Sequence, residues 1–113
     1  MPLSIAELAA PAIRMLCPKS AYQECRNNPD AIVIDVREPH ECQQQPVAGS
    51  INIPRGSLEV ALPQQVNNPD QPLYLHCASG MRATLAAEQL LRQGYTHVSV
   101  IQASVEDLCA MRG

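Results

Sequence analysis

Leu73–Arg82, which reads LYLHCASGMR, is the stretch that decides the fold of this 113-residue chain. Its first part, Leu73 to His76, is a short apolar run typical of a strand that is buried on both faces of a sheet. From about Arg82 to Gln93 the apolar residues recur at helical spacing, which predicts a helix. Cys77 therefore lies in a tight loop between a strand and a helix.

Short apolar runs and helical patterns alternate along the rest of the chain. They predict further strands over residues 31–35, 51–53 and 97–101, and helices over residues 20–26, 38–45, 57–66 and after Ser104. This alternation is typical of βαβ units around a parallel sheet. We expect a single α/β domain over residues 1–113, with a central, mostly parallel sheet and helices on both faces.

An extra N-terminal helical segment is expected over residues 1–16. Ser4 and Glu7 form a capping-box pattern, which predicts a helix that runs from Ser4 to Leu16. Pro11 would kink this helix.

The composition and charge of the chain argue against several classes of protein. Hydrophobic residues make up 46% of the chain, which fits a globular domain with its own core. The net charge of −3 gives no reason to expect nucleic acid or an anionic membrane as a partner. No apolar run approaches the roughly 20 residues that a membrane helix needs, and the N-terminus lacks the basic start of a secretory signal. We therefore expect a cytoplasmic protein with reduced thiols.

The chain contains five cysteines, an odd number that cannot all pair within one chain. None of them forms a C-x-x-C motif, so a structural zinc site is not expected. Cys42 follows the strand that ends at Asp35 and should lie on the same side of the sheet as Cys77. An ordinary helix cysteine is the favoured interpretation of Cys42, and a sulfur acceptor or disulfide partner of Cys77 is the alternative.

The loop after Cys77 has the chemistry of an anion cradle. Where a strand passes into a helix, backbone N–H groups turn inward and the first helical turn adds unpaired donors. Gly80 allows backbone conformations that a side chain forbids, Ser79 adds a hydroxyl, and Arg82 adds a permanent positive charge. Such a setting favours the thiolate, the nucleophile of covalent catalysis. The alternative is a buried structural cysteine with Arg82 merely solvated.

Several motifs, in the right order, resemble those of the rhodanese family and of its single-domain sulfurtransferases in particular. Cys77–Arg82 is similar to the family's C-x-x-G-x-R active-site loop, and VIDVRE, Val33–Glu38, is similar to its D-V-R-E strand end. GSINIP, Gly49–Pro54, is similar to its G-A-I-N-I-P segment, and Gly94, Tyr95 and Val98 match a G-Y-x-x-V before its last strand. The resemblance covers the chain from Cys17 to Arg112.

The resemblance implies a sulfurtransferase that carries a persulfide on Cys77. The backbone amides of the loop would surround the sulfur: Ala78, Ser79, Gly80, Met81 and Arg82. The Arg82 side chain would also attract an anionic donor. Asp35 and Arg37 would be supporting residues that tie the strand end to neighbouring loops, with substrate contact as the alternative.

The partners that the resemblance implies are small molecules. Thiosulfate is the expected sulfur donor, and cyanide or a thiol is the expected acceptor. A sulfur-carrier protein is a further candidate partner. The resemblance implies no metal and no organic cofactor.

Three positions depart from the family pattern. Gln45-Pro46 stands where the family has Gly-His, Ala103-Ser104 stands where it has Gly-Gly, and Leu108 stands where a Trp is common. None of these changes removes the nucleophile. The Ala103-Ser104 pair is expected to reshape the wall of the pocket.

Two other functions stay open. A cysteine phosphatase or an arsenate reductase would suit His76-Cys77, but the phosphatase signature places one residue more between cysteine and arginine than the four that separate Cys77 from Arg82. The shorter loop suits a sulfur atom better than a tetrahedral oxyanion. A non-catalytic binding module on the same scaffold is the third candidate, because a fold does not determine a function.

Overall fold

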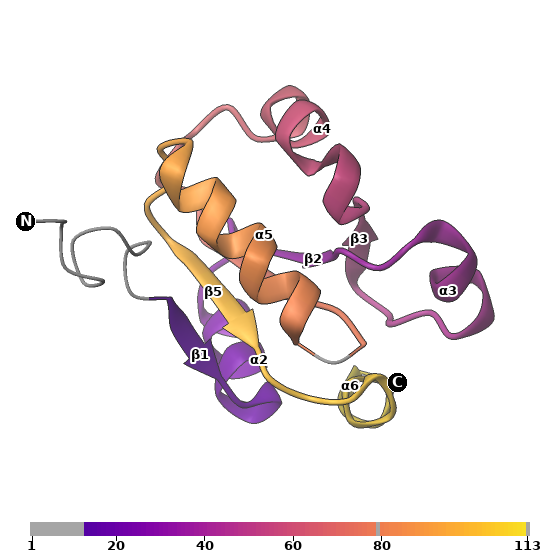
Figure 1. Ribbon diagram of the computed structural model, residues 1–113. Coiled ribbons are helices and arrows are strands. Elements are labelled where there is room, and N and C mark those ends of the chain that lie inside the picture. The colour runs from indigo at the N-terminus through magenta and orange to yellow at the C-terminus, as the bar shows by residue number, and fades with distance from the viewer. Residues whose placement is uncertain (1–12, 79, 113) are drawn as a thin grey trace, which may run out of the picture.

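A single five-stranded sheet forms the centre of the protein (Figure 1). The computed structural model describes residues 13–78 and 80–112. Its strands are β1 (Arg14–Leu16), β2 (Ile32–Asp35), β3 (Ser50–Asn52), β4 (Leu73–His76) and β5 (Val98–Ile101). Its helices are α2 (Pro18–Asn27), α3 (Pro39–Gln44), the 3-10 turn η1 (Arg55–Ser57), α4 (Leu58–Gln65), α5 (Met81–Arg92) and α6 (Val105–Arg112).

All strand pairs in the sheet are parallel, in the order β1-β5-β4-β2-β3. The central strand β4 pairs with β2 on one side and with β5 on the other, so that Leu73 lies opposite both Ile32 and Val98. Every residue of β4 is buried. The predictions of a parallel sheet and of a buried strand at Leu73–His76 are therefore confirmed, and the carboxyl ends of β2 and β4 lie side by side.

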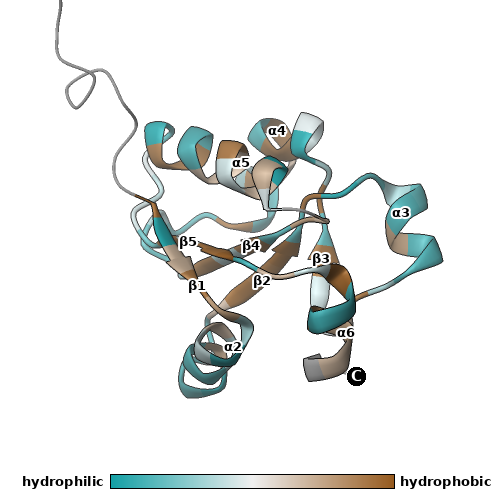
Figure 2. Ribbon diagram, turned by 60° about the horizontal axis from the view of Figure 1, so that its bottom comes forward, coloured by the Kyte–Doolittle hydropathy of each residue, from teal (hydrophilic) through white to brown (hydrophobic). Residues whose placement is uncertain are grey.

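Helices cover both faces of the sheet, as predicted. Figure 2 shows α4 and α5 on one face and α2 and α6 on the other. The first core cluster joins the sheet to buried residues of α4 and α5, which include Leu62 and Leu90. The second joins it to α2 and α6 through Tyr22 and Leu108. Both faces of the central strands are thus removed from water, which explains why these strands read as continuous apolar runs.

The prediction of a helix up to Leu16 is wrong at its C-terminal end. Residues 14–16 form the strand β1, which pairs with β5 at the edge of the sheet. Arg14 is held there by a hydrogen bond from its Nε to Ser99 Oγ (2.9 Å). The open edge of β5 offers backbone partners to these residues, and helical periodicity carries no information about such a distant edge. The rest of the predicted helix lies in residues 1–12, outside the described residues.

The helix α2 begins two residues earlier than predicted. Pro18, not Ser20, is the first residue of the helix, and Cys17 is the N-terminal cap residue. Proline suits this position because its fixed φ matches the helix and it has no N–H to leave unpaired. Within the part of the chain that the structure describes, no helix has the length and apolar character needed to cross a membrane.

Candidate functional site

Cys77 lies directly after β4, at the carboxyl edge of the parallel sheet, and the loop leads within a few residues into α5. Ligands of open α/β sheets bind at this edge. The Cys77 side chain is fully buried, and Gly80 is the N-terminal cap residue of α5. Gly80 adopts a φ of +88°, which lies in the left-handed region that favours glycine. The loop conformation therefore requires a glycine at this position.

Among the residues that the structure describes, two donate backbone hydrogen bonds to the Cys77 sulfur. The N–H of Gly80 donates to Sγ at 3.0 Å, and the N–H of Ala83 in the first turn of α5 donates at 3.3 Å. A helix N-terminus leaves such donors without an intrahelical partner, so they are available to an anion. Gly80 belongs to the predicted cradle, whereas Ala83 was missed because the prediction stopped at Arg82. Ala78 and Met81 are exposed, and Ser79 lies outside the described residues.

Arg82 is engaged in an ion pair that the sequence did not indicate. Its Nη1 and Nη2 donate to the two carboxylate oxygens of Glu41 at 2.6 and 2.8 Å. These hydrogen bonds hold the pKa of Glu41 at about 2 and raise the pKa of Arg82. The Arg82 guanidinium, which was expected to attract an anionic donor, is therefore already paired with the carboxylate of Glu41.

Glu41, like Ala83, is a site residue that sequence reasoning missed. It occupies the third position of α3, where one carboxylate oxygen also accepts the backbone N–H of Glu38 at 2.8 Å. A glutamate three residues after the cap residue is a recognisable signal for such a capping interaction. No sequence pattern indicates the second role, the contact with Arg82.

Asp35 and Arg37 form a buried ion pair behind the site, at the end of β2. The Arg37 Nη2 donates to Asp35 Oδ2 at 2.7 Å and to the carbonyl oxygen of Gln45 at 2.7 Å, so this pair links β2 to the residue that ends α3. Asn52 Nδ2 donates to the backbone carbonyls of both Asp35 and Arg37. Burial is the largest single effect and would raise the pKa of Asp35, but the hydrogen bonds and charges around the carboxylate, those of Arg37 foremost, together lower it. These contacts position α3 and, with it, Glu41.

His76 and Cys42 lie close to this buried pair. His76 is fully buried beneath the cysteine loop, and its Nε2 shares a hydrogen bond with Ser50 Oγ at 2.8 Å. Burial, and then the charge of Asp35, raises the pKa of the Cys42 thiol to about 11. Cys42 is thus kept as a neutral thiol at ordinary pH.

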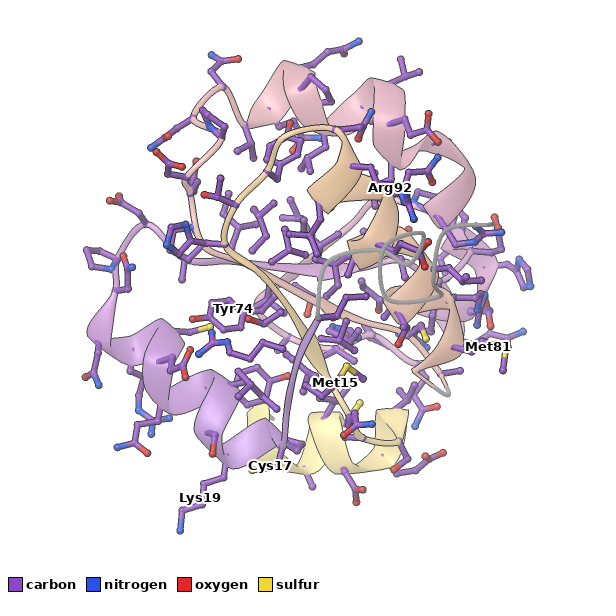
Figure 3. All side chains as sticks on the ribbon, turned by 60° about the vertical axis from the view of Figure 1, so that its left-hand side comes forward. Met15, Cys17, Lys19, Tyr74, Met81 and Arg92 are labelled. Atoms are coloured by element: carbon purple, nitrogen blue, oxygen red, sulfur yellow. The ribbon has the colours of Figure 1, made fainter. Side chains whose placement is uncertain are left out.

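A cleft of about 630 Å³ opens beside the cysteine loop. It brings together residues that are far apart in the sequence: Met15, Ala78, Met81, Leu85, Ala103 and Ser104. Figure 3 labels two of them, Met15 on β1 and Met81 at the start of α5. The Ala103-Ser104 pair, which departs from the family pattern, thus forms part of the wall of this cleft.

The chain is similar in sequence to a known protein family and to several characterised proteins. The family described as "Rhodanese-like domain" matches residues 18–111. The thiosulfate sulfurtransferase PspE of Escherichia coli is 37% identical over 65 residues, which cover 58% of this chain and 62% of PspE. A thiosulfate:glutathione sulfurtransferase of Saccharomyces cerevisiae is 30% identical over 93 residues, which cover 73% of this chain and 67% of that protein.

A solved structure gives the same result for the fold. The rhodanese-related protein of Thermoplasma volcanium superimposes with a TM-score of 0.70 at 26% identity, over 87% of this chain and 92% of that chain. The matched region spans less than two thirds of some curated relatives, as the 62% of PspE illustrates.

Proposed function

Because this chain belongs to the rhodanese family, we propose that it is a sulfurtransferase that carries sulfane sulfur on Cys77. The observation that supports this most directly is the pair of backbone N–H groups, from Gly80 and Ala83, that point at the Cys77 sulfur. Charge-assisted hydrogen bonds of this kind stabilise an anionic sulfur, both as the thiolate and as the persulfide.

The reaction proceeds in two steps. The Cys77 thiolate attacks the outer sulfur of thiosulfate, a new S–S bond forms, and the bond to the sulfonate sulfur breaks so that its electron pair leaves with sulfite. The persulfide then carries a negative charge on its terminal sulfur. A thiolate or cyanide attacks that sulfur, which regenerates the Cys77 thiolate and releases a new persulfide or thiocyanate. The yeast relative is a thiosulfate:glutathione sulfurtransferase, which supports a small thiol as the acceptor.

Intact-mass spectrometry after thiosulfate treatment tests the proposal. We expect the wild-type protein to gain one sulfur atom and Cys77→Ser to gain none. Cys17→Ser is the matched control, because Cys17 is exposed and a hydrogen bond with Ser20 lowers its pKa, which makes it the thiol most open to unspecific sulfur uptake. This control should still gain the sulfur. Uptake that persists in Cys77→Ser and is lost in Cys17→Ser would refute the assignment.

Hydrolysis of an aryl phosphate separates this proposal from the phosphatase alternative. Four residues between Cys77 and Arg82 form a short loop, and Arg82 is occupied by Glu41. We therefore expect no phosphatase activity that depends on Cys77. Clear turnover that Cys77→Ser abolishes would favour the phosphatase, and a protein inert in both assays would favour a binding module.

A further inference from the structure

The cleft beside the cysteine loop gathers exposed apolar side chains. Among the side chains that the structure describes, five large hydrophobic ones are exposed, and three of these line the cleft: Met15, Met81 and Leu85. Met81 is 71% exposed to solvent. Apolar groups gathered around a concave surface indicate an apolar ligand, whereas single exposed hydrophobic residues need no explanation.

The cleft offers little to a small dianion. None of the described residues that line it has an ionisable side chain. Two of its hydroxyl groups already hydrogen-bond within the protein: Thr84 Oγ1 donates to the carbonyl of Gly80 at 2.7 Å, and Ser104 Oγ accepts the N–H of Asp107 at 3.1 Å. The nearest cation of the loop, Arg82, is paired with Glu41.

The cleft lies against the loop that carries the buried nucleophile. Cys77 itself is fully buried, whereas its loop neighbours Ala78, Gly80 and Met81 line the cleft. A donor whose sulfane sulfur reaches Cys77 from this side leaves the rest of its structure in contact with Met81, Leu85 and Met15. Methionine side chains are flexible and polarizable, so they adapt to apolar groups of different shapes.

We propose that the sulfur donor of this protein is an organic compound in which an apolar group adjoins the sulfane sulfur, and that this group lies in the cleft formed by Met15, Met81 and Leu85. The inference rests on the proposed function and specifies its substrate class. With a thiosulfonate, R–SO₂–S⁻, the Cys77 thiolate forms an S–S bond to the terminal sulfur. The S–S bond to the sulfonyl sulfur breaks, and its electron pair leaves with the sulfinate, R–SO₂⁻.

A pair of thiosulfonates with the same reacting group tests the inference. We compare kcat/KM for benzenethiosulfonate and methanethiosulfonate, each divided by its rate with a small thiolate in solution to remove intrinsic reactivity. Partial burial of the ring should favour the benzene compound by about tenfold, which corresponds to about 1.4 kcal/mol.

The variants use exposed hydrophobic residues at matched positions on helices. Leu85→Ser and Met81→Ser remove apolar surface from the cleft, and each should lower the preference for the benzene compound by about fivefold. Val60→Ser is the control, because Val60 is as exposed as Met81, at 71%, but belongs to α4 and does not line the cleft. The preference of Val60→Ser should equal that of the wild type.

The outcomes separate this inference from the proposed function. Equal normalised rates for the two thiosulfonates, with sulfur still added to Cys77, would refute the apolar donor and leave the sulfurtransferase intact. A preference that Leu85→Ser and Met81→Ser retain would also refute it, because the ring would then bind elsewhere. Failure of every donor to add sulfur to Cys77 would instead refute the proposed function.

Discussion

Replacement of Gly80 by alanine tests how the loop geometry supports the reaction. Gly80 has a φ of +88°. The hydrogen bond from its N–H to the Cys77 sulfur is shorter than the one from Ala83. A Cβ atom at this position would meet nothing within 4 Å, so no steric clash contributes to the effect. The substitution therefore isolates the backbone conformation.

Two opposing effects determine the loss of stability in Gly80→Ala. A residue with a side chain pays about 1–2 kcal/mol to adopt the left-handed conformation. Alanine also restricts the unfolded chain, which stabilises the protein by about 0.4–1 kcal/mol. We expect a net loss of about 1 kcal/mol in the free energy of unfolding, which lowers the Tm by about 4 °C for a domain of this size.

The effect on sulfur transfer should be larger than the effect on stability. Alanine relieves its strain by rotation of the loop backbone, which moves the Gly80 N–H away from the Cys77 sulfur. A hydrogen bond to a charged group contributes about 1.5–3 kcal/mol, so its loss slows the formation of the persulfide by at least about tenfold. The assay is the rate of sulfur uptake at Cys77, measured by intact mass under single-turnover conditions.

Two other glycines serve as controls. Gly94 also has a positive φ, +108°, with open space around a built Cβ, but it lies beyond the far end of α5. Gly94→Ala should lose a similar amount of stability and keep the wild-type rate. Gly56, with open space and no positive φ, should tolerate alanine without loss of either. If Gly80→Ala loses stability as Gly94→Ala does but transfers sulfur at the wild-type rate, the argument from the Gly80 amide is refuted.

Four further tests concern the surroundings of the loop. Asp35→Asn leaves the buried guanidinium of Arg37 without its charged partner. Urea denaturation should therefore show a decrease of about 3–5 kcal/mol in the free energy of unfolding, and a decrease below 1 kcal/mol would contradict this. Glu41→Gln leaves Arg82 unneutralised and should raise kcat/KM for thiosulfate several-fold; an unchanged value would show that the charge of Arg82 is immaterial. Because the pKa of Glu41 is lowered from 4.5 to about 2, its stabilising effect is complete above pH 4.5 and is lost as the pH falls toward 2. The pH midpoint of acid unfolding, followed by circular dichroism, should therefore shift in Glu41→Gln. The pKa of Cys42, about 11, predicts slow alkylation at neutral pH and no Cys42–Cys77 linked peptide after mild peroxide.

Much of the site could be predicted from local patterns. The strand at Leu73–His76 was identified in full, since a continuous apolar run reports burial on both faces directly. The need for glycine at position 80 follows from the turn between strand and helix, and the structure confirms it with a positive φ. These features depend on residues within a few positions of one another, which is the range over which periodicity and turn chemistry carry information.

The edge strand β1 shows where such patterns fail. Residues 14–16 pair with β5, whose residues lie 85 positions further along the chain, as the Arg14–Ser99 hydrogen bond illustrates. A short segment at the edge of a sheet takes its conformation from a backbone partner that no local pattern reveals.

The sequence by itself determined that Cys77 lies at the carboxyl end of a buried strand, with a glycine and the start of a helix directly after it. Only the tertiary structure decided what surrounds that sulfur. The order of the strands brings α3 next to α5, so that Glu41 forms an ion pair with Arg82, which lies 41 positions further along the chain. The same packing places Met15 beside Met81 in one cleft. Contacts at such separations depend on how the elements are arranged in space, which the spacing of residues along the chain does not encode.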